Sequence, residues 1–176
     1  MIKYMNLIGI KARKASEYKV TTEVKNKVLN DYAKLIKNEK KFIINQNSKD
    51  INYARKKGLK ENLIKRLHLN ENKLDGIINS ILKIAKLRDP IDNTLDKWKR
   101  PNGLNIKRVS IPIGVIGVIY ESRPNVTSDV ASLCFKSGNV VILKGGSEAI
   151  NSNKALAKLF RKALKKNKVD ENFIQF

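Results

Sequence analysis

The stretch NVVILKGGSEA, Asn139 to Ala149, decides the class of fold. Its first six residues are mostly β-branched or aliphatic, which is typical of a strand buried on both faces. Ser147 then begins a segment with helical periodicity that runs to about Lys166. A buried strand that leads straight into a helix is the unit of a parallel sheet covered by helices. The stretch therefore predicts a strand, a tight turn and a helix, with Lys144 at the carboxyl edge of the sheet.

The segments on either side continue the same alternation. IGVIGVIY, residues 113–120, predicts a second buried strand that is apolar throughout. PNVTSDVASLCFKSG, residues 124–138, predicts a helix with proline at its start and Gly138 at its end. NFIQF, residues 172–176, predicts the beginning of a third strand. A parallel sheet cut at that strand would leave an apolar edge open, so we expect the chain to be part of a longer one.

The residues before this region have a different character. Residues 3–87 show helical spacing, with Thr21 or Thr22, Ser48 and Asn70 as candidate N-caps, Gly58 as a helix end and Pro90 as the last stop. Between 91 and 111, two alternating stretches flank a Pro-Asn-Gly turn, which indicates a β-hairpin.

The expected fold class is therefore α/β with three parts. Residues 1–90 form a helical N-terminal segment, residues 91–111 form a hairpin arm, and residues 112–176 form an incomplete parallel β/α core.

The high net charge suggests a nucleic-acid-binding protein, but the distribution of the charged residues along the chain argues against that function. The net charge is +21, but residues 111–160, which contain the Gly-Gly turn, carry only five basic and three acidic residues. A nucleic-acid-binding protein would concentrate charge at its site and would favour arginine, so we expect no nucleic-acid partner. One cysteine and one histidine provide no disulfide and no metal cluster. The longest apolar run, Ile111 to Tyr120, is too short to span a bilayer, and no signal peptide is visible, which predicts a cytoplasmic protein.

The turn after Lys144 is the first candidate site. Gly145 and Gly146 would permit a sharp turn and a close approach by a ligand, and the free N–H groups of the helix that Ser147 begins would favour an anion. A simple corner with an exposed lysine explains the same residues equally well. Neither the G-x-G-x-x-G fingerprint nor a P-loop occurs in the sequence.

The second candidate site follows the other strand, in YESRPNVT, residues 120–127. Asn125 could stabilise an oxyanion, although a helix cap is the more common use of asparagine at such a position. Arg123 could meet an anionic substrate or lie on the surface, and Glu121 is equally open. Cys134, among apolar neighbours in a helix, is interpreted as a small buried side chain, and His68 as structural.

Two motifs in these segments carry a resemblance to a known family. GVIGVIYESRPNVT, residues 114–127, and SGNVVILKGGSEA, residues 137–149, resemble the γ-glutamyl phosphate reductases of the aldehyde dehydrogenase superfamily. NEKKFIINQNSKDINYARKKGL, residues 38–59, and RLHLNENKLDGI, residues 66–77, agree more loosely. The resemblance covers essentially the whole chain but only the first part, less than half, of the family's length.

The resemblance implies a reaction and a role for each motif. The reaction is NADPH-dependent reduction of L-glutamate 5-phosphate to L-glutamate 5-semialdehyde, with release of phosphate, in proline biosynthesis. Lys144 falls where the superfamily binds the adenosine ribose of the cofactor, and Ser147 stands where NAD-preferring relatives often place a glutamate, which fits NADPH. Asn125 falls on the oxyanion asparagine, and the hairpin on the oligomerisation arm of a homo-oligomer.

The family's catalytic thiol lies in a glycine-rich segment that these residues do not contain, and Cys134 does not match its position. We therefore expect the 176 residues to be inactive alone. Two further functions stay open: a non-catalytic module that binds a nucleotide or phosphate, and a basic nucleic-acid-binding protein, whose affinity would fall steeply with salt.

Overall fold

The computed structural model describes residues 2–121 and 123–176. Met1 and Ser122, which belong to the predicted segments 1–90 and 112–176, lie outside the described residues. The helices before the hairpin are α1 (Ile2–Ser16), α2 (Thr22–Asn38), α3 (Lys40–Lys56), α4 (Glu61–Leu67) and α5 (Glu71–Lys86). The hairpin consists of β1 (Thr94–Lys99) and β2 (Asn105–Val109). The remaining elements are β3 (Val115–Tyr120), α6 (Pro124–Lys136), β4 (Val140–Gly145), the 3₁₀ turn η1 (Ser147–Ala149), α7 (Ile150–Lys166), the 3₁₀ turn η2 (Glu171–Phe173) and β5 (Ile174–Gln175).

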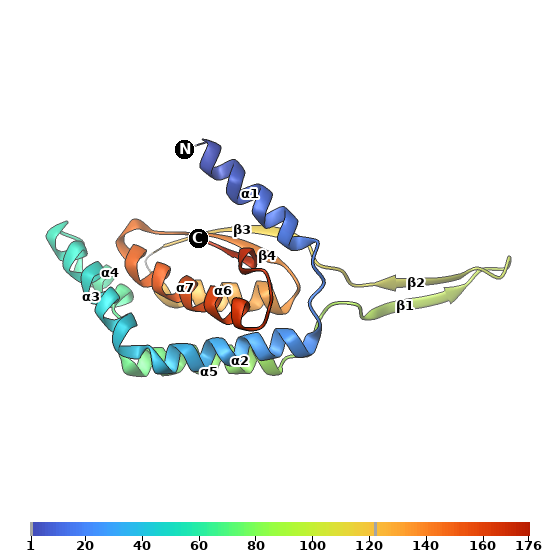
Figure 1. Ribbon diagram of the computed structural model, residues 1–176, viewed down its shortest axis with the longest axis horizontal. Coiled ribbons are helices and arrows are strands. Elements are labelled where there is room, and N and C mark those ends of the chain that lie inside the picture. The colour runs from blue at the N-terminus through green and yellow to red at the C-terminus, as the bar shows by residue number, and fades with distance from the viewer. Residues whose placement is uncertain (1, 122) are drawn as a thin grey trace.

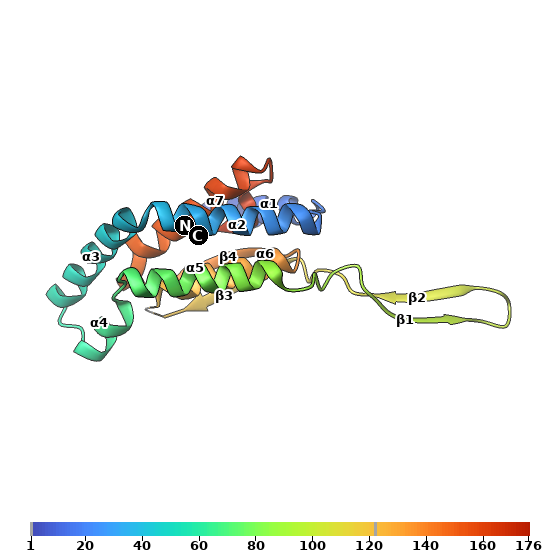
Figure 2. The ribbon, with the colours of Figure 1, turned by 90° about the horizontal axis from the view of Figure 1, so that it is seen from below.

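The parallel sheet has the strand order β3-β4-β5. Val115 pairs with Val140 and Tyr120 with Gly145, while Val141 pairs with Ile174. Helices α6 and α7 lie on one face of the sheet, α2 and α5 lie behind them, and α1 runs along the other face (Figures 1 and 2). The α/β class and the third parallel strand in NFIQF are therefore confirmed.

The core of the molecule is built around four aromatic rings from different elements. Tyr32 of α2 lies 4.5 Å from Phe160 of α7, between ring centroids. Phe135 of α6 lies 5.8 Å from Phe160 and 5.4 Å from Phe173, both edge to face. All four side chains are fully buried, which stabilises the fold through apolar burial and favourable ring geometry. The cluster joins the helical N-terminal segment to the β/α part in one core.

The helix ends test the expected capping residues. The Thr21 hydroxyl accepts a hydrogen bond from the N–H of Val24, and the Asn70 side chain accepts one from the N–H of Lys73, so both caps are confirmed. Gly58 follows α3 with φ +69, and bonds from Gly58 and Leu59 back to Arg55 and Ala54 close the helix end as expected.

The prediction of an N-cap at Ser48 is wrong. Helix α3 already begins at Lys40, so Ser48 lies in its middle and its hydroxyl donates to the carbonyl of Ile44. Serine in a helix interior commonly makes this bond back to the preceding turn, so the residue type did not mark a helix start here.

Strand β3 differs from the prediction of a strand buried throughout. Ile119 is 86% exposed and Ile113, just before the strand, is 84% exposed. In the part of the chain that the structure describes, β3 pairs only with β4, so it is an edge strand with one uncovered side. An apolar composition therefore predicted the strand correctly but not its burial.

The hairpin extends away from the rest of the molecule (Figures 1 and 2). Strands β1 and β2 pair antiparallel, with Trp98 opposite Ile106, and every residue of β1 is exposed. The Pro-Asn-Gly turn at 101–103 connects them as the sequence predicts, and Gly103 has the positive φ of +87 that favours glycine.

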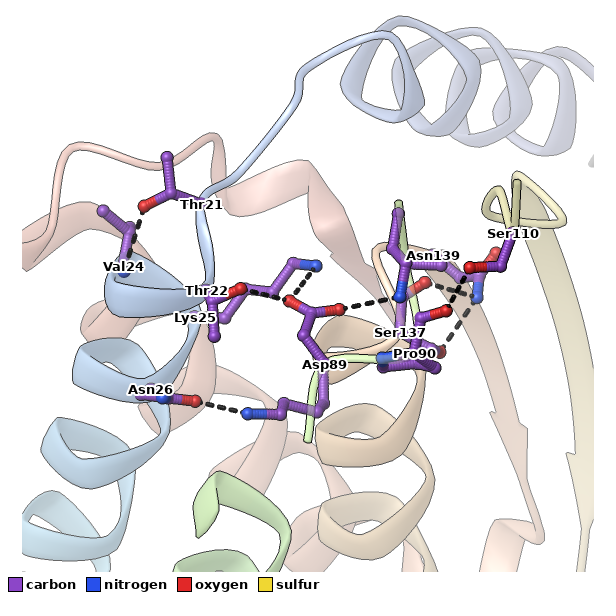
Figure 3. A network of polar contacts seen from close by, with 12 residues as sticks. Thr21, Thr22, Val24, Lys25, Asn26, Asp89, Pro90, Ser110, Ser137 and Asn139 are labelled. Carbon is purple, nitrogen blue, oxygen red and sulfur yellow. Dashed lines mark hydrogen bonds and ion pairs between the residues drawn. The ribbon is translucent and has the colours of Figure 1, made fainter. Parts of the chain in front are cut away.

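A network of polar contacts holds the base of the hairpin (Figure 3). Asp89, which precedes β1, accepts hydrogen bonds from the Lys25 ammonium and the Thr22 hydroxyl of α2, both at 2.8 Å. The Ser110 hydroxyl, just after β2, donates to the carbonyl of Pro90. Burial alone would raise the pKa of Asp89, but hydrogen bonds from Lys25, Thr22 and the N–H of Ile91 outweigh it, and the pKa is lowered.

Candidate functional site

The carboxyl ends of β3 and β4 lie side by side. Ile119 pairs with Lys144 and Tyr120 with Gly145 at the last positions of the parallel ladder. The residues that follow both strands therefore emerge at the same edge of the sheet, where ligands bind in open α/β folds. The structure thus brings the two candidate segments, 123–125 and 144–147, to neighbouring strand ends.

The Lys144 side chain is exposed at this edge. Its ammonium makes one hydrogen bond within the described residues, 3.3 Å to the carbonyl of Gly145. Lys144 has no carboxylate within salt-bridge distance in that part of the chain. Its positive charge is therefore available to an anionic ligand.

Gly145 is required for close packing and not for a sharp turn. It lies inside β4, and Gly146 has an ordinary φ of −60, so the expectation that both glycines supply a special turn geometry is wrong. A Cβ on Gly145 would lie 3.1 Å from the Tyr120 ring and would overlap the Asn153 amide. Both groups belong to a buried chain of hydrogen bonds, in which the Tyr120 hydroxyl contacts Thr127 Oγ1 at 2.6 Å and Thr127 donates to Asn153.

The start of α7 is already capped by a carboxylate from α3. Asp50 accepts hydrogen bonds from the N–H groups of Asn151 at 3.0 Å and Ser152 at 2.8 Å, and from the Ser152 hydroxyl at 2.6 Å. The prediction that this helix start offers free N–H groups is therefore wrong for these two residues. Asp50 is only 1% exposed and sits where an anion would be favoured by the helix dipole.

The turn η1 lies between Lys144 and the capped helix. Ser147 is exposed, and its hydroxyl donates to Glu148 Oε2 at 3.5 Å. A Cβ on Gly146 would overlap the carboxylate of Glu148, so that carboxylate folds back over the turn. The corner therefore combines one free cation, one exposed hydroxyl and one nearby negative charge.

Asn125 lies in the first turn of α6 and is half-buried. The N-cap position is Arg123, which makes no side-chain cap bond, so the interpretation of Asn125 as a cap is wrong. Its amide instead donates to Asp129 Oδ2 at 3.2 Å. One amide hydrogen is used in this way, which leaves the other for a ligand.

Arg123 and Asn125 line a groove between the start of α6 and the helices α4 and α5. The groove has a volume of about 540 Å³, and Arg66, Lys73 and Asp129 also contribute to its wall. Sequence reasoning missed Asp129 and Arg66. The spacing of Asn125 and Asp129, four residues apart on one helix, was the available signal for the first, whereas Arg66 is brought near only by tertiary packing.

The remaining candidates have structural roles. Cys134 is buried, and burial raises the pKa of its thiol, as expected for an inert side chain. The carbonyl of His68 accepts a hydrogen bond from Lys73 at the end of α4. Among residues 2–121 and 123–176, no three His, Cys, Asp or Glu side chains gather as metal ligands. Likewise, none of the described helices has the length and apolarity to cross a membrane.

Comparison with known proteins identifies relatives of this chain. No family profile matches the chain. The γ-glutamyl phosphate reductase of Persephonella marina is 42% identical over 175 residues, which are 98% of this chain and 39% of that protein. The crystal structure of γ-glutamyl phosphate reductase from Thermotoga maritima matches with a TM-score of 0.93 and 42% identity, over 96% of this chain and 41% of that one.

A more distant structure shows the wider fold. Propionaldehyde dehydrogenase from Rhodopseudomonas palustris matches 97% of this chain and 36% of its own, with a TM-score of 0.65 at 14% identity. The chain spans well under half the length of each of these proteins. Over the part that it spans, the chain is similar to the γ-glutamyl phosphate reductases and has the aldehyde dehydrogenase fold.

Proposed function

We propose that this chain is part of an NADPH-dependent reductase that converts L-glutamate 5-phosphate to L-glutamate 5-semialdehyde and releases phosphate, a step in proline biosynthesis. The names of its relatives support the reaction. The observation that carries the proposal is the exposed Lys144 at the carboxyl edge of the sheet, whose ammonium forms no salt bridge with the described residues, three positions before the exposed Ser147. Such a corner suits the ribose and phosphate oxygens of a dinucleotide.

In this proposal, the corner after β4 binds the adenosine end of NADPH. The bound cofactor would supply the hydride. Lys144 would hold the ribose region, and Ser147 would face the 2′-phosphate without repelling it. Because Asp50 already occupies the N–H groups of Asn151 and Ser152, the ammonium and the hydroxyl must provide most of the attraction. Gly145 and Gly146 keep the backbone beside them free of side chains.

The residues that follow β3 would bind the acyl group of the substrate. The free amide hydrogen of Asn125 would stabilise the oxyanion, and Arg123 would meet the anionic substrate. The only cysteine of the 176 residues is the buried Cys134, so we propose that these residues bind ligands without completing the reaction. The exposed hairpin would act as an arm in a homo-oligomer of the complete reductase, in the cytoplasm.

The burial of Cys134 also favours the second candidate function, a non-catalytic module that binds a nucleotide or phosphate. The two functions differ in what a complete reading frame would contain. A frame that adds a glycine-rich segment with an accessible cysteine supports the reductase. A frame that adds no such thiol supports the binding module.

Substitution of Lys144 tests the nucleotide corner. We expect Lys144→Ala to weaken NADPH binding by about 1–3 kcal/mol, because a charged hydrogen-bond partner is lost at an accessible site. Fluorescence titration with NADPH measures the effect, and parallel titration with NADH tests the preference for the phosphorylated cofactor. Lys97→Ala, on the exposed strand β1, is the matched control and should bind NADPH as the unaltered chain does. If the Lys144→Ala chain binds NADPH as tightly as the unaltered chain does, Lys144 does not contribute to the cofactor site.

A further inference from the structure

The end of α3, the loop after it and α4 together form a strongly basic segment, residues 55–66. Six of these residues are basic and only Glu61 is acidic, so the segment has a net charge of +5. All six basic side chains are exposed: Arg55, Lys56, Lys57, Lys60, Lys65 and Arg66. Positive charge is therefore concentrated on this α3–α4 basic segment, whereas residues 111–160 carry only five basic and three acidic residues.

Neighbouring side chains do not neutralise the charge of the basic segment. None of its six basic side chains forms a hydrogen bond or an ion pair with residues 2–121 or 123–176, which the structure describes. The Lys57 ammonium lies over the Tyr53 ring, 5.2 Å from its centroid, and this contact leaves the charge in place. The segment therefore presents its full positive charge to the solvent.

The basic segment lies beside the corner after β4. Helices α3 and α4 are at the end of the molecule opposite the hairpin, where the chain passes from β4 into α7 (Figures 1 and 2). Ala149 of η1 belongs to a small buried cluster with four side chains of these two helices: Ile51, Ala54, Ile64 and Leu67. The apolar sides of α3 and α4 therefore hold the turn that follows Lys144, while their basic side chains surround that contact on the solvent side.

Helix geometry gives the distance over which the charge must act. Asp50 accepts a hydrogen bond from the N–H of Ser152 at the start of α7, so α3 touches α7 at this residue. Lys56 follows Asp50 by six residues in α3, which is a rise of about 9 Å. The screening length is about 10 Å at an ionic strength of 0.1 M and about 30 Å at 0.01 M. The charge of the segment therefore reaches the corner at moderate salt and acts strongly there at low salt.

We propose that the α3–α4 basic segment steers NADPH to the corner at Lys144 by long-range electrostatic attraction. The 2′-phosphate and the pyrophosphate make NADPH a multiply charged anion. The corner itself attracts such a ligand weakly from a distance, because the Glu148 carboxylate folds over the turn and offsets the charge of Lys144. A surface of one sign beside a site raises the local concentration of an oppositely charged ligand and speeds its association.

Steering differs from direct contact in the rate constant that it changes. Charges at the margin of a site act mainly on the association rate and its salt dependence, whereas groups that touch the bound ligand also determine its dissociation rate. This inference rests on the proposed cofactor site at Lys144. It adds residues outside that site which determine how fast the cofactor arrives.

Two variants with the same loss of charge test the steering of NADPH. The steering variant combines four substitutions in the basic segment: Arg55→Gln, Lys56→Gln, Lys57→Gln and Lys60→Gln. The control variant combines four substitutions on the exposed hairpin, at the opposite end of the molecule: Lys97→Gln, Lys99→Gln, Lys107→Gln and Arg108→Gln. Each variant loses one arginine and three lysines, so the two have the same net charge. Glutamine is a good helix former, and circular dichroism checks that both variants are folded.

Stopped-flow fluorescence with NADPH gives the association and dissociation rates at several salt concentrations. At low salt, we expect the steering variant to associate about tenfold more slowly than the control variant, with an unchanged dissociation rate. The difference should disappear at high salt, where the charges are screened. Equal association rates of the two variants at low salt would overturn the proposal, and so would a change confined to the dissociation rate.

A second measurement tests the basic segment without NADPH. A nitroxide that bears a carboxylate and one that bears an amine report the local potential through the relaxation that each causes at amide NMR signals. In the unaltered chain and the control variant, the anionic nitroxide should relax the amides of residues 144–151 more strongly than the cationic one. In the steering variant this contrast should fall by roughly half or more. An unchanged contrast would refute the proposal, whereas failure of the unaltered chain to bind NADPH would count against the proposed cofactor site instead.

Discussion

At the scale of single residues, the polar side chains between α3 and α7 show how buried polar groups satisfy one another's hydrogen bonds. Asn47 donates to the carbonyl of Leu67 and to the Ser152 hydroxyl and accepts from the N–H of Leu69, while Asp50 caps α7. All of these side chains are almost completely buried and satisfied by one another. The carboxylate of Asp50 fixes the start of α7, and therefore the turn after Lys144, from a helix about 100 residues away in the chain.

Removing that carboxylate should destabilise the protein. We expect Asp50→Ala to lower the free energy of unfolding by about 2–3 kcal/mol, because two backbone N–H groups and a hydroxyl lose a charged acceptor. Urea denaturation followed by circular dichroism measures the loss. Asp75→Ala is the control, since Asp75 pairs with Lys40 on the surface with its side chain half exposed, and it should change stability by less than about 1 kcal/mol. A loss for Asp50→Ala as small as the control's would mean that water replaces the cap.

At the scale of elements, the end of β4 is shaped by what packs against it. Lys144 is exposed, while the next residue, Gly145, is buried against the Tyr120 ring of β3 and the Asn153 amide of α7. The strand, its neighbour and the following helix therefore meet at a position with no room for a side chain. This close packing keeps the exposed lysine at a defined place on the sheet edge.

A methyl group at this position should disturb the packing. We expect Gly145→Ala to destabilise the chain by about 1–3 kcal/mol, because its Cβ would overlap buried groups that cannot move freely. Gly117→Ala is the matched control in the adjacent strand, since a Cβ there meets nothing within 4 Å. Thermal unfolding of both variants gives the comparison. An equal effect at both positions would contradict the packing argument.

At the scale of the whole molecule, the helical N-terminal segment is tied to the β/α core by ionic as well as aromatic contacts. Asp31 of α2 accepts hydrogen bonds from the Lys166 ammonium at 2.8 Å and the Asn167 amide at 2.9 Å. The hydrogen bond from Lys166 lowers the pKa of Asp31 despite its burial, and Asn167 adds to the effect. Asp89 at the base of the hairpin also has a lowered pKa.

These lowered pKa values predict loss of stability in acid. A carboxyl group with a lower pKa in the folded state stabilises the protein above its unfolded pKa of about 3.9, and the benefit disappears as the pH falls through the folded pKa. We therefore expect the free energy of unfolding to decline below about pH 4. Asp31→Asn should make this decline shallower, as measured by urea denaturation across the acid range. An identical acid dependence in Asp31→Asn would show that the ion pair contributes nothing.

Local signals in the sequence predicted the elements well because they depend on neighbouring residues. Thr21 and Asn70 cap their own helices, and Gly58 closes α3 through its positive φ. The same logic failed at Ser48, because helix α3 already begins eight residues earlier, at Lys40. The order of strands and helices also predicted the parallel sheet, and therefore the common edge to which Lys144 and Asn125 belong.

The sequence by itself determined the α/β class, the parallel strands, the hairpin and the edge at which the candidate residues lie, because periodicity, caps and turn residues act over short distances. Only the tertiary structure decided what surrounds those residues. It placed Asp50 on the start of α7, left Ile119 uncovered on an edge strand, and set Arg66 in a groove with Asp129. These contacts join residues far apart in the chain, and such contacts depend on how whole elements pack and not on the local pattern of any one segment.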